Sequence, residues 1–255
     1  MEPQAILKEL IQLSRELGQE SRQLAILGEG NTSADCGDGT FWVKASGSQL
    51  GTLDESGVSR VSFAAVEELA SRPNLTEEDV ETGLRNALVD KTQKKPSVET
   101  FLHAICLQQP DVHFVGHTHP VAVNQILCSK MGAEPFMQHL FPDGVVVCGI
   151  APMVIPFVDP GVKLSRAAND AFKRYQDQWG RSPKVILMVN HGLVGLGKTA
   201  KEALNISLMA DKFARILAGT LAFGGPNYFS LETTLRVDNR LDEVYRRKVL
   251  ENKGG

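Results

Sequence analysis

Residues 112–120, VHFVGHTHP, constrain the fold and the chemistry of this chain more than any other stretch. Apolar residues followed by two histidines and a proline predict a buried β-strand that ends at Pro120. Side chains alternate along a strand, so His117 and His119 are expected to point to the same face. Two adjacent imidazoles suit a borderline-soft divalent metal ion. The alternative is a polar strand end that happens to carry two histidines.

Length and composition indicate a chain that can bury a hydrophobic core. It has 255 residues, of which 42% are hydrophobic. Predicted strands and helices interleave with short connections, so we expect one domain over residues 1–255. The net charge is −3, and no run of lysine or arginine occurs, which argues against nucleic acid as a partner.

The cysteines and the N terminus bear on the expected location. The four cysteines form no CxxC pair and are expected to be buried thiols in a reducing compartment; they are Cys36, Cys106, Cys128 and Cys148. The chain shows no signal-peptide pattern and no apolar run long enough to cross a bilayer. We therefore expect a cytoplasmic protein without a membrane partner.

Hydrophobic periodicity predicts helices alternating with strands. Helices are expected near residues 6–17, 64–71, 76–90, 97–109, 121–129, 162–179, 199–221 and 231–250. Strands are expected at 41–43, near 61, and at 112–119, 145–147, 153–155 and 185–189, with a hairpin turn at 37–39. Ser97 is the expected N-cap of its helix. This alternation by itself favours a parallel sheet.

His191 is the best candidate for a third metal ligand. It follows the apolar strand predicted at 185–189 and precedes Gly192, a position at a strand end where sites collect in layered α/β folds. A histidine that caps the next helix is the alternative. His103 lies four residues after Glu99 on a predicted helix, where a surface pair is the plain interpretation.

Glu99 is the candidate proton-transfer residue. It is expected in the first turn of the helix before the histidine strand, where the helix dipole favours the ionised form. Desolvation beside an apolar pocket would raise its pKa towards the range useful for general acid–base catalysis. An ordinary helix-start glutamate is the alternative.

Two glycine-rich segments form a candidate anion site. Residues 28–33, GEGNTS, and 44–48, KASGS, combine small residues, amides and hydroxyls that cradle a phosphate or carboxylate. Lys44 would add a positive charge. The alternatives are a pair of ordinary turns and an exposed strand lysine.

Residues 192–199, GLVGLGKT, fit the P-loop pattern GxxxxGK[ST] between a predicted strand and a predicted helix. A P-loop normally begins its sheet, and a later strand supplies the aspartate that binds magnesium. Only about two helices are predicted to follow here. A nucleotide-binding protein is therefore the disfavoured hypothesis.

The motifs together resemble the class II aldolase/adducin-like superfamily, which includes fuculose- and rhamnulose-phosphate aldolases and ribulose-phosphate 4-epimerases. The matching motifs, in order, are GNTS at 30–33, SG at 46–47, PSVE at 96–99, HTH at 117–119, PG at 160–161 and HG at 191–192. Residues 44–47 and 236–247 look closest to the aldolase portion of bifunctional rhamnulose-phosphate aldolase/dehydrogenases.

The resemblance implies a three-layer α/β/α fold with a central, mainly antiparallel sheet. It implies a homotetramer with active sites at subunit interfaces. It also implies Zn2+, or another divalent metal such as Mn2+ or Co2+, on three ligands: His117, His119 and His191. Glu99 would move a proton at the carbon next to the chelated carbonyl. The substrate phosphate would be held by Asn31, Ser46, Gly47 and Ser97, with Lys44 beside them.

The implied activity is that of a divalent-metal-dependent aldehyde-lyase. It would cleave or form a carbon–carbon bond of a ketose phosphate through a metal-stabilised enediolate. A 4-epimerase, a dehydratase or a decarboxylase on the same metal site is the alternative. A non-catalytic adducin-like module is disfavoured, because such members lack the metal ligands.

The chain departs from the aldolase pattern at two positions of the phosphate loop. Gly28 stands where those aldolases often have threonine, and Val98 stands where they have a second serine. Two hydroxyls are therefore missing. Either Lys44 compensates for them, or the substrate carries a carboxylate or a differently placed phosphate. Family members also use a tyrosine from a neighbouring subunit as an acid, for which Tyr228 is a candidate.

Overall fold

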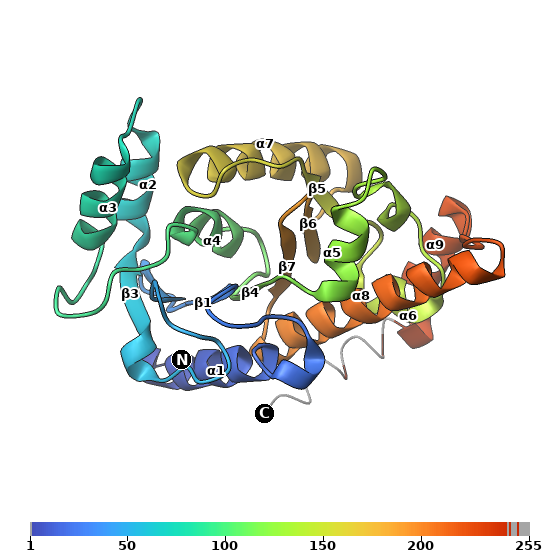
Figure 1. Ribbon diagram of the computed structural model, residues 1–255, viewed down its shortest axis with the longest axis horizontal. Helices are drawn as coiled ribbons and strands as arrows, with labels where there is room; N and C mark the ends of the chain where they lie inside the picture. Colours follow the sequence, from blue (N-terminus) through green and yellow to red (C-terminus); the bar gives the residue numbers. More distant parts are fainter. Residues whose placement is uncertain (1, 244, 246–248, 250–255) are drawn as a thin grey trace.

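A seven-stranded sheet with helices on both faces organises the protein (Figure 1). The computed structural model describes residues 2–243, 245 and 249. The strand order is β3-β2-β1-β4-β7-β6-β5. The strands are β1 (Asn31–Asp35), β2 (Thr40–Lys44), β3 (Val58–Ser62), β4 (Phe114–Thr118), β5 (Met153–Ile155), β6 (Val185–Met188) and β7 (Gly192–Gly197).

Every pair of neighbouring strands is antiparallel except β5 and β6, which are parallel. The mainly antiparallel sheet implied by the resemblance is confirmed, and the parallel sheet favoured by alternation alone is wrong. Two tight hairpins reverse the chain. One uses Gly37 and Gly39, with φ of 74° and 83°, between β1 and β2. The other places Asn190, with φ of 57°, between β6 and β7. Glycine and asparagine tolerate this left-handed conformation.

Helices cover the two faces unequally. On one face lie α1 (Pro3–Leu17) and α8 (Ala200–Thr220), below the sheet in Figure 1. On the other face lie α2 (Phe63–Ser71), α3 (Glu77–Asn86), α4 (Thr100–Leu107) and α7 (Val162–Trp179). At the right of Figure 1 are α5 (Val121–Leu127), α6 (Pro142–Cys148) and α9 (Leu231–Asp238). The layers are therefore α/β/α.

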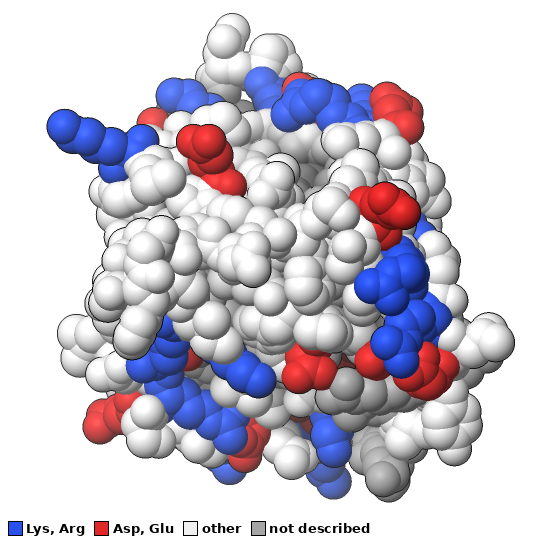
Figure 2. Space-filling model, turned by 90° about the vertical axis from the view of Figure 1, so that its right-hand side faces the viewer, with Lys and Arg blue, Asp and Glu red and all other residues white. Residues whose placement is uncertain are grey.

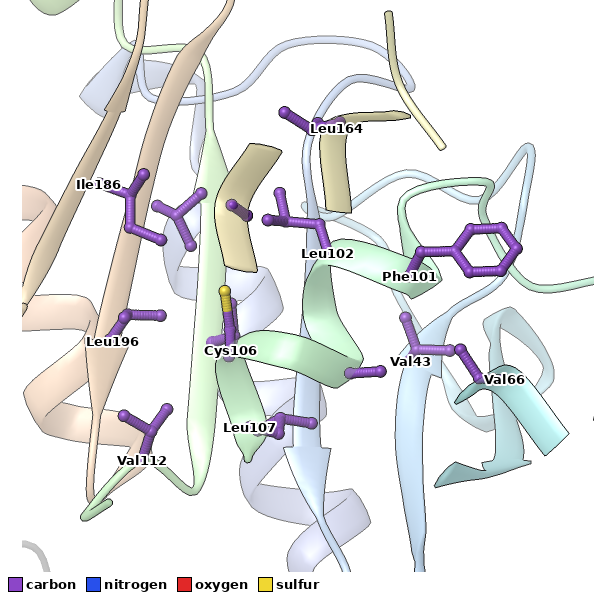
Figure 3. Close-up of a cluster of buried hydrophobic side chains, with 14 of the residues drawn as sticks. Val43, Val66, Phe101, Leu102, Cys106, Leu107, Val112, Leu164, Ile186 and Leu196 are labelled. Atoms are coloured by element: carbon purple, nitrogen blue, oxygen red, sulfur yellow. The ribbon is translucent and has the colours of Figure 1, made fainter. Parts of the chain in front are cut away.

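Strict alternation along the strands divides the core. On β6, Ile186 and Met188 pack towards α4 and α7, whereas Val185 and Leu187 pack towards α8. Figure 3 shows the first of these clusters, in which Ile186 and Leu196 face side chains of α4 and α7. Val115 of β4 packs in this same cluster. His117 lies two residues after Val115, so its side chain points to the face of the sheet that α4 and α7 cover.

One predicted strand is wrong. Residues 145–147 lie in the helix α6, which begins at Pro142 and is followed by Gly149 at φ 82°. A short apolar run fits a buried strand and a buried helix equally well, and the proline and glycine that bound it are helix-end signals.

The remaining predicted elements agree with the structure to within a few residues, apart from two details. The last predicted helix, 231–250, begins as α9 but is shorter than expected, because α9 ends at Asp238 with Asn239 as its C-cap. Residues 244, 246–248 and 250 of the predicted range lie outside the described part of the chain. Cys36 and Cys106 are buried as expected, but Cys128 is exposed because it follows the last residue of α5 at the surface. Cys148, the last residue of α6, is half-buried. No helix in the described ranges is long and apolar enough to cross a membrane.

Candidate metal and substrate site

Three histidines converge at one end of the sheet. His117 lies in β4 and His119 directly follows that strand, whereas His191 lies in the turn between β6 and β7. The ring centroids are 4.8 to 5.2 Å apart. One nitrogen from each ring lies within 4.8 Å of the others. Because β7 and not a helix follows His191, the helix-capping alternative for this residue is wrong.

The outer nitrogens of two rings are held by acceptors. His117 Nδ1 lies 2.9 Å from the Leu193 carbonyl, and His119 Nδ1 lies 3.3 Å from Glu29 Oε2. Each Nδ1–H donates outward, so both Nε2 lone pairs point inward, 3.1 Å apart. Lone pairs this close repel unless a proton or cation lies between them. Two imidazoles on one tetrahedral zinc, at about 2.0–2.1 Å each, place their nitrogens about 3.3 Å apart. The donor set therefore fits a divalent metal ion.

Glycine is required where the backbone approaches the histidines. A Cβ at Gly192 would lie 2.5 Å from the Thr118 carbonyl oxygen and 2.8 Å from His119 Cδ2. A Cβ at Gly30, where φ is +70°, would lie 2.7 Å from the His117 carbonyl oxygen. Gly30 of the GNTS motif and Gly192 of the HG motif thus let β1 and β7 pack closely against the end of β4.

Glu99 is in contact with this cluster. Its side chain is 11% exposed. Oε1 lies 3.2 Å from His191 Nε2, and Oε2 lies 3.5 Å from His117 Nε2. The N-cap position of α4 is occupied by Glu99 and not by Ser97, whose hydroxyl instead accepts the Glu99 N–H at 3.3 Å. Burial alone raises the pKa of Glu99, but the two imidazoles and Asn31 hold it below its usual value. The expected upward pKa shift is therefore wrong.

Asn31 and His103 complete a buried polar network around that carboxylate. Asn31 Nδ2 donates to Glu99 Oε2 at 2.5 Å, and its Oδ1 contacts His103 Nε2. His103 Nδ1 lies 2.6 Å from the Ser33 hydroxyl. His103 is fully buried, so the surface pair expected from the sequence is wrong: α4 turns this side of the helix onto the sheet. Burial lowers the pKa of His103 to about 3.

Sequence reasoning missed two residues of the site, His103 and Glu29. A signal existed for His103, because α4 is apolar on nearly every side and a lone histidine in such a helix is buried. For Glu29 only its place between two glycines of the first loop hinted at a special role.

The two glycine-rich segments and the PSVE motif meet beside Glu99. Ser46 N–H donates to the Lys95 carbonyl at 2.9 Å, and Ser97 N–H donates to the Lys44 carbonyl at 3.4 Å. Ser46 and Gly47 are exposed, and Ser97 is half-buried. The structure thus brings together the loop residues that the sequence singled out as anion ligands.

Lys44 is buried and not an exposed strand lysine. Its Nζ donates to the Ser48 carbonyl at 2.6 Å and to the Gly28 carbonyl at 3.3 Å, which links the two glycine-rich segments. Burial lowers the pKa of Lys44, and the Glu99 carboxylate opposes that shift.

The residues of the P-loop pattern have a structural role instead. Six of the eight form β7, and a Cβ at Gly195 or Gly197 would collide with atoms of α8 or its N-cap. Lys198 Nζ lies 3.1 Å from Asp111 Oδ1, and the Thr199 hydroxyl caps α8 by accepting the Glu202 N–H. A phosphate-binding loop is absent from residues 192–199.

Tyr228 lies on a different part of the described chain from the histidines. Its hydroxyl donates to the Pro135 carbonyl at 3.0 Å, its ring packs beside α8 side chains, and burial raises its pKa. Within one subunit this tyrosine makes no described contact with the cluster.

Comparison with known proteins agrees with the fold. The family described as Class II Aldolase and Adducin N-terminal domain matches residues 8–218. The chain therefore belongs to this family, and the resemblance of its motifs is confirmed.

Three similar proteins illustrate the family. The chain is 29% identical over 202 residues to the Uncharacterized oxidoreductase YuxG of Bacillus subtilis (strain 168), covering 76% of this chain but only 27% of that protein. It is 27% identical to the N-terminal Class II Aldolase domain of a conserved protein from Thermoplasma acidophilum, with a TM-score of 0.64 over 83% of this chain and 93% of that one. An L-fuculose 1-phosphate aldolase superposes with a TM-score of 0.70 at 18% identity, over 93% and 96% of the two chains. The last comparison shows the fold alone.

Proposed function

We propose that residues 1–255 act as one divalent-metal-dependent aldehyde-lyase domain that cleaves or forms a carbon–carbon bond of a ketose phosphate. The observation that carries the proposal is the contact of one buried carboxylate, Glu99, with two of three converging imidazoles. A loop with two exposed residues, Ser46 and Gly47, lies beside it. Such a combination of metal ligands, proton-transfer group and anion site suits aldol chemistry on a phosphorylated sugar.

The ion would be held by His117, His119 and His191 and would be zinc, manganese or cobalt. A divalent ion in this position supplies Lewis-acid stabilisation of the negative charge that develops on a ketose oxygen when the neighbouring carbon–carbon bond breaks. Glu99 lies within 3.5 Å of two ligand nitrogens, so it can take or return the proton at the carbon next to that oxygen.

The substrate phosphate would be held by Ser46, Gly47 and Ser97, with Lys44 buried beneath them. Asn31, which the resemblance also implies as a phosphate ligand, instead has its amide engaged by Glu99 and His103. Gly47, with φ of +78°, presents its N–H in an exposed turn, and a Cβ there would meet nothing within 4 Å. Lys44 adds positive charge to the same segment.

The exposed side chain of Val98 supplies no hydroxyl where the aldolases have a second serine. We therefore expect this loop to contact the phosphate through fewer hydroxyls than those aldolases use, with the exposed Gly47 N–H as a backbone donor.

The same site would also support a 4-epimerase, a dehydratase or a decarboxylase, each of which needs charge stabilisation beside a carbonyl. A non-catalytic adducin-like module is disfavoured because the three ligands and Glu99 are all in contact. The chain spans about a quarter of YuxG, so the activity of that whole protein does not transfer to it.

We further propose a homotetramer in the cytoplasm, where its free thiols would stay reduced. Several large apolar side chains are exposed on the segments after α5 and in the last turns of α8 and just beyond it; they are Met131, Met137, Ile216, Leu221 and Phe223. These segments belong to the side of the molecule seen in Figure 2, where uncharged surface fills the centre and charged side chains lie mostly at the edge. An uncharged face of this kind suits burial against other copies.

The decisive experiment is turnover of a panel of ketose 1-phosphates by protein loaded with Zn2+, Mn2+ or Co2+. We expect release of an aldehyde, near-stoichiometric metal, and loss of both in a His117→Ala, His119→Ala double variant. Glu99→Gln should lower kcat by about 100-fold or more while metal is retained. Glu78→Gln, on the exposed α3, is the matched control.

Products distinguish the alternatives. Inversion of a sugar without free aldehyde would indicate an epimerase, loss of water a dehydratase, and release of carbon dioxide a decarboxylase. Metal-free protein, or unchanged kcat in Glu99→Gln, would contradict the proposed mechanism.

A further inference from the structure

A chain of four buried side chains leads from β1 to the carboxylate of Glu99. The Ser33 hydroxyl lies 2.6 Å from His103 Nδ1, and His103 Nε2 contacts Asn31 Oδ1. Asn31 Nδ2 then donates to Glu99 Oε2 at 2.5 Å. Ser33 and His103 are fully buried, and Asn31 is 3% exposed, so water does not replace these partners. His103 is not itself among the converging metal-ligand candidates.

The ionised carboxylate sets the direction of every hydrogen bond in this chain. A carboxylate only accepts, so the Asn31 group facing it must be the NH2, and Asn31 Oδ1 must accept on its other side. His103 therefore donates from Nε2–H. A neutral imidazole carries one N–H, so His103 Nδ1 accepts, and the Ser33 hydroxyl donates. Only one tautomer of His103 satisfies all four groups.

The two oxygens of Glu99 are consequently not equivalent. Oε2 accepts the Asn31 N–H. Oε1 is buried and lies 3.2 Å from His191 Nε2, but it has no hydrogen-bond partner among the described residues. A group that must gain and lose a proton does so at the oxygen whose lone pair is not already engaged.

We propose that His103 is a positioning residue for Glu99: through Asn31 it holds Oε2, so that Oε1 is the atom that exchanges the proton with substrate. In this step the Oε1–H bond forms as a substrate C–H bond breaks, with the electron pair left on the substrate, and the reverse step returns the proton. The inference rests on the proposed function, in which Glu99 transfers this proton.

Three substitutions in this chain of hydrogen bonds test the proposal through the kinetic constants kcat and KM. His103→Leu removes the donor to Asn31, whereas His103→Gln keeps an NH2 close to the position of Nε2, and Ser33→Ala removes only the outermost donor. We expect His103→Leu to lower kcat about tenfold or more with metal content unchanged and KM changed less than about twofold. His103→Gln should retain most of the wild-type kcat. The kcat of Ser33→Ala should lie between those of His103→Leu and His103→Gln. His113→Leu, at a half-exposed histidine, is the control.

A spectroscopic measurement tests the same chain without turnover. In zinc-loaded wild-type protein labelled with 15N-histidine, we expect His103 to be the Nε2–H tautomer with Nδ1 as acceptor. Ser33→Ala should shift the Nδ1 resonance. Because the tautomer is measured in wild-type protein, it tests the stated hydrogen-bond directions even when a His103 variant does not fold.

The results separate this inference from the proposed function. Equal kcat losses in His103→Leu and His103→Gln, a change in KM alone, or an Nδ1–H tautomer would overturn the role of His103 while leaving the aldehyde-lyase intact. If wild-type protein turns over none of the sugar phosphates, the proposed function fails, and the tautomer still decides whether His103 orients Asn31 as stated.

Discussion

At the scale of single residues, the contacts behind the histidines matter as much as the histidines themselves. His119 can offer Nε2 inward because Glu29 accepts its Nδ1–H at 3.3 Å. Glu29 is in turn held by the Ile26 N–H at 2.7 Å. Such outer partners fix the orientation of a ligand ring and raise its basicity.

Removal of this outer partner should weaken metal binding. We expect Glu29→Ala to lower zinc affinity about 10- to 100-fold, because His119 loses its fixed tautomer and orientation. Glu29→Gln, whose amide oxygen still accepts, should lose less. Competition with a chromophoric chelator measures the affinity, and Glu78→Gln provides the baseline. Unchanged affinity in Glu29→Ala would show that His119 is oriented by other contacts.

At the scale of elements, the packing of β7 on α8 explains a glycine-rich sequence that otherwise resembles a nucleotide-binding loop. A Cβ at Gly197 would lie 2.5 Å from the Ala203 nitrogen, and one at Gly195 would lie 3.0 Å from the Ala203 carbonyl oxygen. The backbone of β7 therefore lies almost directly on the first turns of α8.

Adding a methyl group at this contact should be costly. We expect Gly197→Ala to reduce the free energy of unfolding by about 1–3 kcal/mol, since backbone atoms have little room to move. Gly219→Ala near the exposed end of α8 meets nothing within 4 Å and should stabilise by roughly 0.5 kcal/mol. Urea unfolding of both variants checks the contrast. A stable Gly197→Ala protein would mean that β7 does not need this close approach.

Element types were predictable wherever several local signals agreed. The amphipathic α1 and the hairpin between β1 and β2 follow from periodicity and turn residues. Residues 145–147 were not predictable from their own apolarity, because three consecutive valines bury equally well in a strand or a short helix. Strand direction also lay beyond the pattern, since it depends on which strands become neighbours.

At the scale of the whole molecule, the uncharged face in Figure 2 is the surface that we expect to lie between copies of the chain. Leu221 is 70% exposed and Phe223 is 90% exposed at the end of α8, which is unusual for large apolar side chains of a monomer.

A charge on this face should disrupt assembly. If the wild-type protein forms the proposed tetramer, we expect a Leu221→Glu, Phe223→Glu double variant to form smaller particles in light scattering, because association would bury uncompensated carboxylates. Val89→Glu, at a half-exposed position after α3, should leave the particle size unchanged. A wild-type monomer, or a variant of unaltered size, would count against this interface.

Local sequence patterns were sufficient to predict the pair of histidines on one strand face, the turn at His191 and Gly192, and the interleaving of helices with strands. These features depend on local periodicity and on backbone conformations that few residues adopt. The tertiary structure alone decided that Glu99 meets Asn31, 68 positions away, and that His103 and Lys44 are buried. Local patterns show which side of an element faces inward. Which polar groups become partners there depends on how the elements pack, because a buried polar group takes its hydrogen bond from whatever lies against it.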